Sequence, residues 1–463
     1  MKNNQKSNDI DIVTPIFEIF SEVLGMILEL AKELGKIAFR KIFNKLPPLE
    51  KIERKSLGVK KTTNIKEALG IDTRTKKEMM LSDIDFRRHS FIVGASGFGK
   101  TNLISILQEH SLRQEKPIIF FDPKGDMEAL TTFQNICKEY KRPCYIFSEH
   151  YENSISLNPI LEGSINQVVD RIMRSFEWSE PYYRDASRRS LTQALKKLEK
   201  EEKAFTLQAV FDELVQMESK ENIGLIAKIE AILVSDFGKI LNAEQDGLTL
   251  SKIREERACL YIGLSTQGYG ETATAVGKLF LGELLHNSYK TLSNPDDPEA
   301  GLKNPISIFF DEFGSLVTPE FIELQNKCRG AGMELTLAVQ TSADIDRVNP
   351  ELTRQVIENA GNLFILKQRL TDSAQYFAES IGTVLSKKQT YRVENGEQQS
   401  SGSEREVHEL LVHSDIIKNL GIGQCILLRQ GPSRLNLVNV RNRKFDTAVN
   451  HTRKQSVKVE QPL

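Results

Sequence analysis

The sequence predicts an α/β protein whose parallel sheet is interrupted by an all-α insertion. From residue 90 onward, short apolar runs typical of buried parallel strands alternate with helical stretches, beginning with residues 91–93 and 118–121. Five further runs follow, at residues 144–147, 258–264, 306–310, 335–339 and 362–366. Between the third and fourth runs, residues 164–248 carry only helical patterns, and an unstructured connection of that length would be unusual. We therefore expect at least six or seven strands and a helical insertion.

The chain of 463 residues is too long for one ordinary core, so we expect several segments. Residues 61–163 and 249–445 form the two parts of the α/β domain, on either side of the all-α insertion at residues 164–248. Residues 1–60 form an N-terminal amphipathic helix with a basic linker, and residues 446–463 a flexible tail. Within the second part, the Gln, Ser and Gly residues of 394–406 predict a mobile loop.

A long amphipathic helix is predicted over residues 14–45. Thr14 can act as its N-cap, Pro15 suits the first helical position, and apolar residues recur every three or four positions. The longest charge-free stretch, between Glu22 and Glu29, has six residues, far short of the ~20 that a membrane-spanning helix needs. We therefore predict no transmembrane helix. The helix docks on a membrane surface or a small membrane protein, or it packs on the chain's own core or in a coiled coil.

Charge and cysteine content exclude several classes of protein. The 62 Lys and Arg residues nearly balance the 63 Asp and Glu residues, which excludes a globally basic nucleic-acid coat protein but leaves room for a local basic groove. The five cysteines are scattered without CxxC spacing, so neither a disulfide framework nor a zinc ribbon is expected. With no secretory signal pattern, we expect a cytoplasmic protein, free in the cytosol or peripheral at the inner face of the cell membrane.

A phosphate-binding loop follows the first predicted strand and opens a helix. It matches GxxxxGK[ST], and its residues are Gly94, Ala95, Ser96, Gly97, Phe98, Gly99, Lys100 and Thr101. Backbone N–H groups can turn toward a phosphate where no Cβ intervenes, and the helix N-terminus adds positive potential. Lys100 is expected to reach the β- and γ-phosphates of a nucleotide and Thr101 to ligate Mg²⁺.

Two carboxylates follow directly after the strand predicted at residues 306–310. The pair suits hydrolysis of a nucleotide rather than transfer of its phosphoryl group to a second substrate. Asp311 can hold Mg²⁺, and Glu312 can polarise the attacking water. Gln340, at the end of the next strand, is either a contact to the γ-phosphate or a buried polar strand cap. Arg329 and Arg88 either stabilise charge on the phosphate or are solvated surface arginines.

Several motifs together resemble the coupling-protein ATPases of type IV secretion and conjugation, the TraD/TraG-like family, and more distantly the HerA and FtsK DNA motors. They are Arg88-His89, the phosphate-binding loop, Asp122-Pro123-Lys124-Gly125-Asp126, Leu157-Asn158-Pro159, Phe310-Asp311-Glu312, and Arg329-Gly330-Ala331-Gly332 followed by Gln340. The similarity extends from about residue 70 to residue 441. The chain departs from typical members in lacking predicted membrane-spanning helices at its N-terminus.

The resemblance implies a RecA-like ATPase domain with an all-α domain, ATP and Mg²⁺ as cofactors, and a homohexameric ring with ATP between subunits. By matching position, Arg329 would be the arginine finger of a neighbour's site, Arg88 a second interface arginine and Gln340 the sensor. The implied function is ATP-driven DNA translocation that delivers relaxase-bound, single-stranded DNA, and also protein substrates, to a type IV secretion channel. Alternatives are a HerA/FtsK-like motor in segregation or end processing, and a substrate-recruitment platform whose ATPase serves assembly. Residues 265–271 are a candidate pore loop.

Overall fold

The computed structural model describes residues 25, 29–30, 32, 34, 49–52, 67–217, 219–243, 248–297, 299–394, 397–431 and 433–443. The chain divides into two units, residues 1–50 and 51–463, and the fold below is that of the second unit. Most of the helix predicted over residues 14–45, and all of the predicted tail at 446–463, lie outside the described residues.

Among the described residues, eleven strands form one sheet in the order β2-β1-β13-β12-β9-β3-β8-β7-β4-β6-β5. The strands from β9 to β5 in this order are all parallel. They are β3 (Ser90–Val93), β4 (Ile118–Asp122), β5 (Cys144–Phe147), β6 (Cys259–Gly263), β7 (Ile306–Phe310), β8 (Met333–Val339) and β9 (Asn362–Ile365). Each corresponds to one of the predicted apolar runs, so the prediction of a parallel α/β sheet is confirmed.

Four further strands extend the sheet antiparallel beyond β9 and were not predicted. They are β12 (Gln424–Arg429), β13 (Arg434–Val440), β1 (Gly70–Asp72) and β2 (Glu78–Met79). The first and last parts of the described α/β region thus lie side by side, because β1 pairs with β13.

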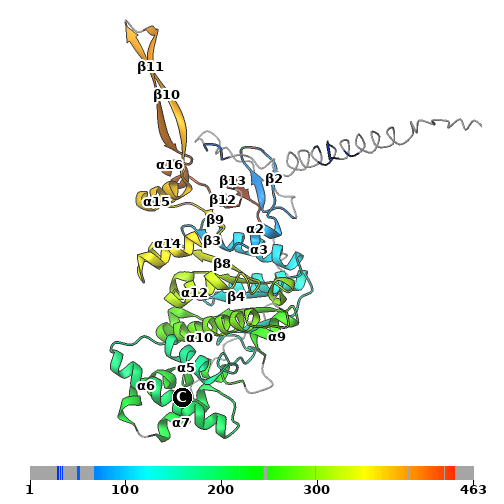
Figure 1. The fold of residues 1–463 in the computed structure, drawn as a ribbon, viewed down its shortest axis with the longest axis vertical. Coiled ribbons are helices and arrows are strands. Elements are labelled where there is room, and N and C mark those ends of the chain that lie inside the picture. Colours follow the sequence, from blue (N-terminus) through cyan, green and yellow to red (C-terminus); the bar gives the residue numbers. More distant parts are fainter. Residues whose placement is uncertain are drawn as a thin grey trace, which may run out of the picture. The chain divides into compact units, whose positions relative to one another are not determined.

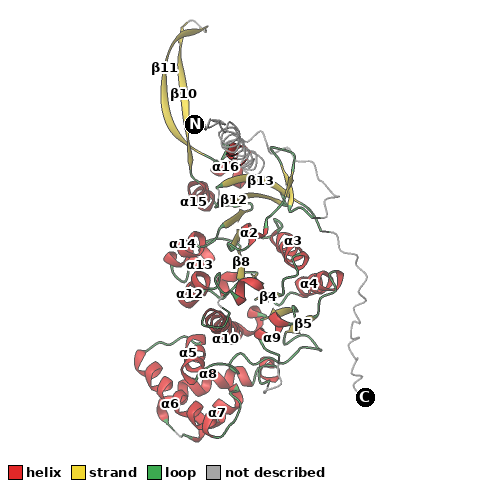
Figure 2. Ribbon diagram, turned by 45° about the vertical axis from the view of Figure 1, so that its right-hand side comes forward, coloured by secondary structure: helices red, strands yellow, loops and turns green. Residues whose placement is uncertain are grey.

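Helices cover both faces of the sheet, as Figures 1 and 2 show. On one face lie α3 (Lys100–Arg113) and α4 (Met127–Glu139), and on the other α10 (Thr266–Leu292), α12 (Pro319–Lys327) and α14 (Pro350–Glu358). Strands covered on both faces read as continuous apolar runs, and β3, β4, β7 and β8 are buried at every position. The remaining helices of this region are α2 (Asp83–Phe86), α9 (Leu250–Glu255), α11 (Ala300–Lys303), α13 (Ala343–Asp346), α15 (Thr371–Ile381) and α16 (Ser414–Lys418), with the 3₁₀ turn η4 (Phe313–Ser315).

Between β5 and α9, the regular elements of the described chain are all helical. The elements are α5 (Ile165–Ser175), α6 (Pro181–Lys200), α7 (Leu207–Gln216), η2 (Lys220–Asn222), α8 (Ile223–Leu233) and η3 (Asp236–Lys239). The apolar faces of these helices pack against one another, and Ile172, Leu195, Leu214 and Ile229 are fully buried. Helix α5 also packs against α10, which connects this helical group to the sheet domain (Figure 1).

The expectation of a mobile loop at residues 394–406 was wrong. Residues Thr383–Glu394 and Glu397–Leu410 are strands β10 and β11, which pair antiparallel in a sheet of their own (Figure 1). Glu394 pairs with Glu397, and the sequence between them is Asn-Gly, the strongest short hairpin signal. The polar composition concealed that signal. Residues 387–390 and 403–406 are exposed, and a strand pair exposed on both faces needs no apolar face.

Candidate nucleotide site

The phosphate-binding loop lies at the carboxyl edge of the parallel strands, between β3 and α3. Gly97 and Gly99 have φ values of 82° and 100°, in the left-handed region that favours glycine. Neighbouring strand ends hold the loop: Gly94 donates its N–H to the Val339 carbonyl (3.2 Å), and Ala95 donates to the Lys367 carbonyl (3.0 Å). The sequence therefore folds into a preformed loop whose exposed residues, Ser96 and Gly97, face solvent.

Phe98, the aromatic residue of the loop, is half-buried beside the segment that follows β9. The Lys367 Nζ lies 5.0 Å from the centroid of the Phe98 ring, and the Arg369 guanidinium lies 5.8 Å away. The Phe98 carbonyl accepts a hydrogen bond from the N–H of Gly423 (3.1 Å). The large side chain is thus accommodated beside the loop by cation–π contacts.

Lys100, the first residue of α3, is buried beneath the loop. Its Nζ donates to the Gly94 carbonyl (2.8 Å) and lies 3.7 Å from Oε1 of Glu312. Burial lowers the pKa of Lys100, against the opposing attraction of Glu312 and Asp311. Thr101, in the first turn of α3, is exposed.

Strand β7 delivers the two carboxylates to the same edge. Asp311 is buried, and burial together with the neighbouring charge of Glu312 raises its pKa to about 6. Glu312 has a φ of 48°, a left-handed conformation that costs a non-glycine residue roughly 1 kcal/mol and is common at functional sites. Its N–H donates to Oδ1 of Asp311 (3.0 Å).

The side chain of Glu312 is the centre of the site. Its Oε1 accepts hydrogen bonds from Nε2 of Gln340 (2.9 Å) and from Nζ of Lys124 (2.8 Å). Burial opposes ionisation of Glu312, but the Lys124 hydrogen bond and the Lys100 charge outweigh it, and its pKa is lowered. The structure thus brings the predicted residues Lys100, Glu312 and Gln340 together.

Lys124 is the residue that sequence reasoning missed. It belongs to the segment Asp122-Pro123-Lys124-Gly125-Asp126, which supported the family resemblance but received no predicted role of its own. The strand order β8-β7-β4 places the ends of these strands next to one another, and this order cannot be deduced from the chain order. A lysine directly after an apolar strand was the available signal.

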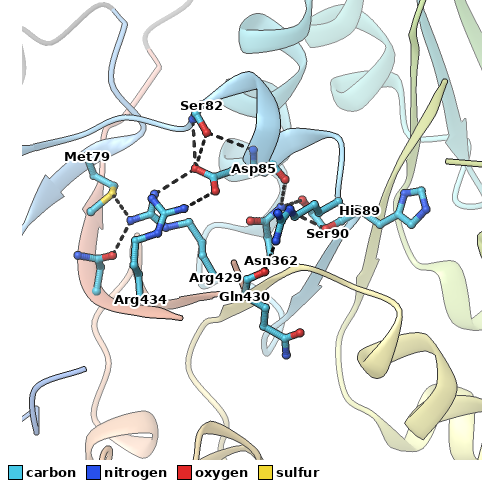
Figure 3. A network of polar contacts seen from close by, with 11 residues as sticks. Met79, Ser82, Asp85, His89, Ser90, Asn362, Arg429, Gln430 and Arg434 are labelled. Atoms are coloured by element: carbon cyan, nitrogen blue, oxygen red, sulfur yellow. Dashed lines mark hydrogen bonds and ion pairs between the residues drawn. The ribbon is translucent and has the colours of Figure 1, made fainter. Parts of the chain in front are cut away.

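Arg88 lies at the opposite end of β3 from the phosphate-binding loop. The four residues of β3 separate them by about 13 Å at a rise of about 3.3 Å per residue. The Arg88 guanidinium donates to the Gln430 carbonyl of its own chain. Figure 3 shows the surrounding buried network, in which Asp85 accepts hydrogen bonds from Ser82 and pairs with Arg429 and Arg434.

Arg329 also lies away from the phosphate-binding loop. It follows α12 and precedes β8, at the amino edge of the parallel strands. There it lines a cavity of about 560 Å³ together with Arg87 and Glu334. The structure therefore does not bring Arg88 or Arg329 to the nucleotide site of the same chain, and a role for either at such a site requires a second copy.

The residues present suit a nucleotide with Mg²⁺. A preformed loop of left-handed glycines leads into a helix N-terminus with a buried lysine. A threonine hydroxyl and an aspartate carboxylate are the hard oxygen donors that Mg²⁺ takes, usually alongside phosphate oxygens and water.

The fold and this site define a P-loop nucleoside triphosphatase with a RecA-like sheet. Residues 305–421 match the family model described as "TraM recognition site of TraD and TraG", and residues 74–256 match "Helicase HerA, central domain". The resemblance to the coupling-protein ATPases of conjugation and type IV secretion, predicted from the motifs, is confirmed.

Solved structures support the same fold. The bacterial conjugative coupling protein TrwBdeltaN70 in an unbound form has a TM-score of 0.62 at 16% identity, with 84% of this chain and 92% of that chain covered. The plasmid coupling protein TrwB in complex with ADP and Mg²⁺ has a TM-score of 0.61 at 15% identity, with 86% and 94% covered. VirB4 of Thermoanaerobacter pseudethanolicus has a TM-score of 0.53 at 14% identity, with 83% and 98% covered.

Among curated proteins, an uncharacterized protein of Mycoplasma pneumoniae is 31% identical over 71 residues, which is 14% of this chain. The chain spans 59% of the length of that relative. In the described part of the chain, no helix combines the length and apolar character needed to cross a membrane.

Proposed function

We propose that the chain is an ATP-hydrolysing motor that translocates DNA and couples relaxase-bound, single-stranded DNA, with protein substrates, to a type IV secretion channel. The observation that carries the proposal is the convergence of Lys100, Gln340 and Lys124 on the Glu312 carboxylate, at the mouth of a phosphate-binding loop. The match to the family model whose description names TraD and TraG supports the conjugative role.

The residues divide the work of hydrolysis among themselves. The N–H groups of the loop and the Lys100 ammonium bind the nucleotide phosphates. Thr101 and Asp311 would hold Mg²⁺, which neutralises charge on those phosphates. Glu312 is ionised at neutral pH because its pKa is lowered, so its carboxylate can orient the attacking water and accept its proton. Gln340 would orient the same water.

We further propose a homohexamer in which Arg329, and with it Arg88, serves the nucleotide of a neighbouring subunit. Both arginines lie at the amino edge of the strands, whereas the nucleotide site lies at the carboxyl edge. The helix over residues 14–45 would dock the ring on the membrane surface or on a small membrane protein.

ATP hydrolysis with and without single-stranded DNA tests the proposal. Lys100→Ala and Glu312→Gln should each lower kcat about a hundredfold or more. The first removes the positive charge that binds the phosphates, and the second removes the carboxylate that accepts the proton. Lys196→Ala, an exposed position on α6, is the matched control and should hydrolyse at the parental rate. Parental activity in either site variant would mean that the assigned site is wrong.

A HerA-like motor working in segregation or end processing is the second candidate, favoured by the match over residues 74–256. Genes for a relaxase and a channel beside the coding sequence would support conjugation, whereas nuclease genes would support this alternative. A recruitment platform is the third candidate, because the model matched at residues 305–421 is described by TraM recognition. Hydrolysis that responds to a candidate protein substrate and not to DNA would favour the platform.

A further inference from the structure

The proton acceptor of the site is restrained in this structure by two hydrogen bonds to one oxygen. Nζ of Lys124 and Nε2 of Gln340 both donate to Oε1 of Glu312, at 2.8 and 2.9 Å, and Nζ of Lys100 lies 3.7 Å from the same atom. An oxygen that already accepts two hydrogen bonds has less room for a third from water, and charge-assisted hydrogen bonds hold the carboxylate in one orientation. Of the three donors, only Lys124 stands outside the roles assigned above.

The turn that carries Lys124 has a defined shape. Asp122, at the end of β4, accepts hydrogen bonds from the N–H groups of Lys124 (3.0 Å) and Asp126 (2.9 Å). The hydroxyl of Tyr261 donates to the same carboxylate (2.6 Å). The backbone of the turn therefore holds its own shape, and the position of the Lys124 ammonium changes when the turn moves as a whole.

The same turn is bonded to the start of α10. The Pro123 carbonyl accepts two hydrogen bonds from Thr266, one from its N–H (2.7 Å) and one from its hydroxyl (2.8 Å). A Cβ at Gly125 would come within 2.2 Å of the Ser265 hydroxyl, so the two segments are in close contact. Ser265 has a φ of 44°, a left-handed conformation that this packing must maintain.

The start of α10 also faces a large cavity. Thr266, Gly270 and Glu271 line a cavity of about 660 Å³. Its other walls include Phe176, Glu177, Lys228, Lys278 and Arg347. Nζ of Lys228 lies 5.9 Å from the ring centroids of both Phe176 and Trp178. Three cationic side chains and the Phe176 ring line the cavity beside two carboxylates, Glu177 and Glu271. Cations therefore outnumber anions there, which suits the phosphates and bases of single-stranded nucleic acid.

We propose that Lys124 is a positioning residue that restrains Glu312, and that the turn at residues 123–125 couples this restraint to DNA contact at the start of α10. Single-stranded DNA in the cavity shifts residues 265–271, the turn follows through Thr266, and Lys124 withdraws from Glu312. Hydrolysis is thus held back until the substrate is present. This inference rests on the proposed function.

Lys124→Met tests the restraint because it keeps the length of the side chain and removes its charge. In the full-length chain, the basal kcat should rise roughly tenfold, equivalent to ~1.4 kcal/mol, while stimulation by a mixed-sequence single-stranded oligodeoxynucleotide falls toward one. Lys124→Arg should recover part of the restraint, with a basal rate between those of the wild type and Lys124→Met. Lys138→Met, an exposed lysine on α4, is the matched control and should leave both rates unchanged.

Thr266→Val tests the connection, because it removes the hydroxyl bond to Pro123 and preserves the shape of the side chain. It should lower the ratio of stimulated to basal rate. A basal rate in Lys124→Met that falls or equals that of the wild type overturns the restraint, and an unchanged ratio in Thr266→Val overturns the connection. If the wild type hydrolyses no ATP with or without DNA, the proposed function itself fails, so the two failures are distinguishable.

Discussion

Lowering the pH from about 7.5 to about 5 should weaken the fold through His89, a buried histidine next to Arg88. Its Nδ1 accepts a hydrogen bond from the N–H of Leu335 (3.1 Å), and its Nε2 donates to the Gln325 carbonyl (3.1 Å). This tautomer joins the start of β8 to the end of α12, on either side of the Arg329 turn. Burial lowers the pKa of His89 from 6.5 to about 4, against the opposing effect of the Gln325 carbonyl.

The sign and size of the effect follow from this difference in pKa. The unfolded chain binds a proton as the pH falls through 6.5, whereas folded His89 stays neutral down to about pH 4. The stability that neutral His89 contributes is therefore complete above pH 6.5 and is lost as the pH falls toward 4. The total is about 3 kcal/mol, of which about 2 kcal/mol is lost by pH 5.

Urea unfolding followed by circular dichroism at the two pH values measures the loss. His89→Gln should be less stable than the wild type at the higher pH, because it loses at least one buried hydrogen bond, but its further loss on acidification should be about 2 kcal/mol smaller. Other titrating groups are common to both proteins and cancel in the comparison. His408→Gln, at an exposed position on β11, should keep the pH dependence of the wild type. Equal acid sensitivity of the wild type and His89→Gln would refute the reasoning.

Three further predictions concern the arginines, the sensor position and the buried network. Arg329→Ala should lose ATP hydrolysis and regain part of it when mixed with Lys100→Ala subunits. In a mixed ring, some interfaces bring an intact Arg329 to an intact phosphate-binding loop. An absence of recovery in the mixing assay would contradict an arginine finger acting between subunits. Gln340→Ala should lower kcat about tenfold with little change in nucleotide affinity, because it loses a hydrogen bond to a charged group; steady-state kinetics with a fluorescent-nucleotide titration separates the two quantities. Asp85→Ala should cost about 3–5 kcal/mol in urea unfolding, because it leaves Arg429 and Arg434 buried without their carboxylate; a loss below ~1 kcal/mol would show that the network stabilises little.

The sequence predicted the parts of the site that follow directly from strands. The phosphate-binding loop that ends in Lys100, and the residues Glu312 and Gln340, each follow an apolar run. The carboxyl ends of parallel strands lie at one edge, so their convergence could be expected. Lys124 could not be assigned in this way, because its approach to Glu312 depends on β4 lying beside β7. Strands β12 and β13 were missed because nothing in their own sequence says that they extend the parallel sheet antiparallel. Arg88 is close to the phosphate-binding loop along the chain, yet the extended backbone of β3 carries the two apart.

The strand direction that separates these residues also argues for an assembly. A parallel sheet has chemically different edges, and here the phosphate-binding loop, Glu312 and Gln340 occupy the carboxyl edge, whereas Arg88 and Arg329 occupy the amino edge. No side-chain rearrangement within one chain can bring an arginine across the length of the strands to its own nucleotide. A second copy that presents its amino edge to the carboxyl edge of the first would bring them together, and repetition of that contact generates a ring or a helix. The charge balance of the whole chain is compatible with this arrangement, because the proposed contacts with nucleotide and DNA need positive charge only at these edges and in the cavity beside α10.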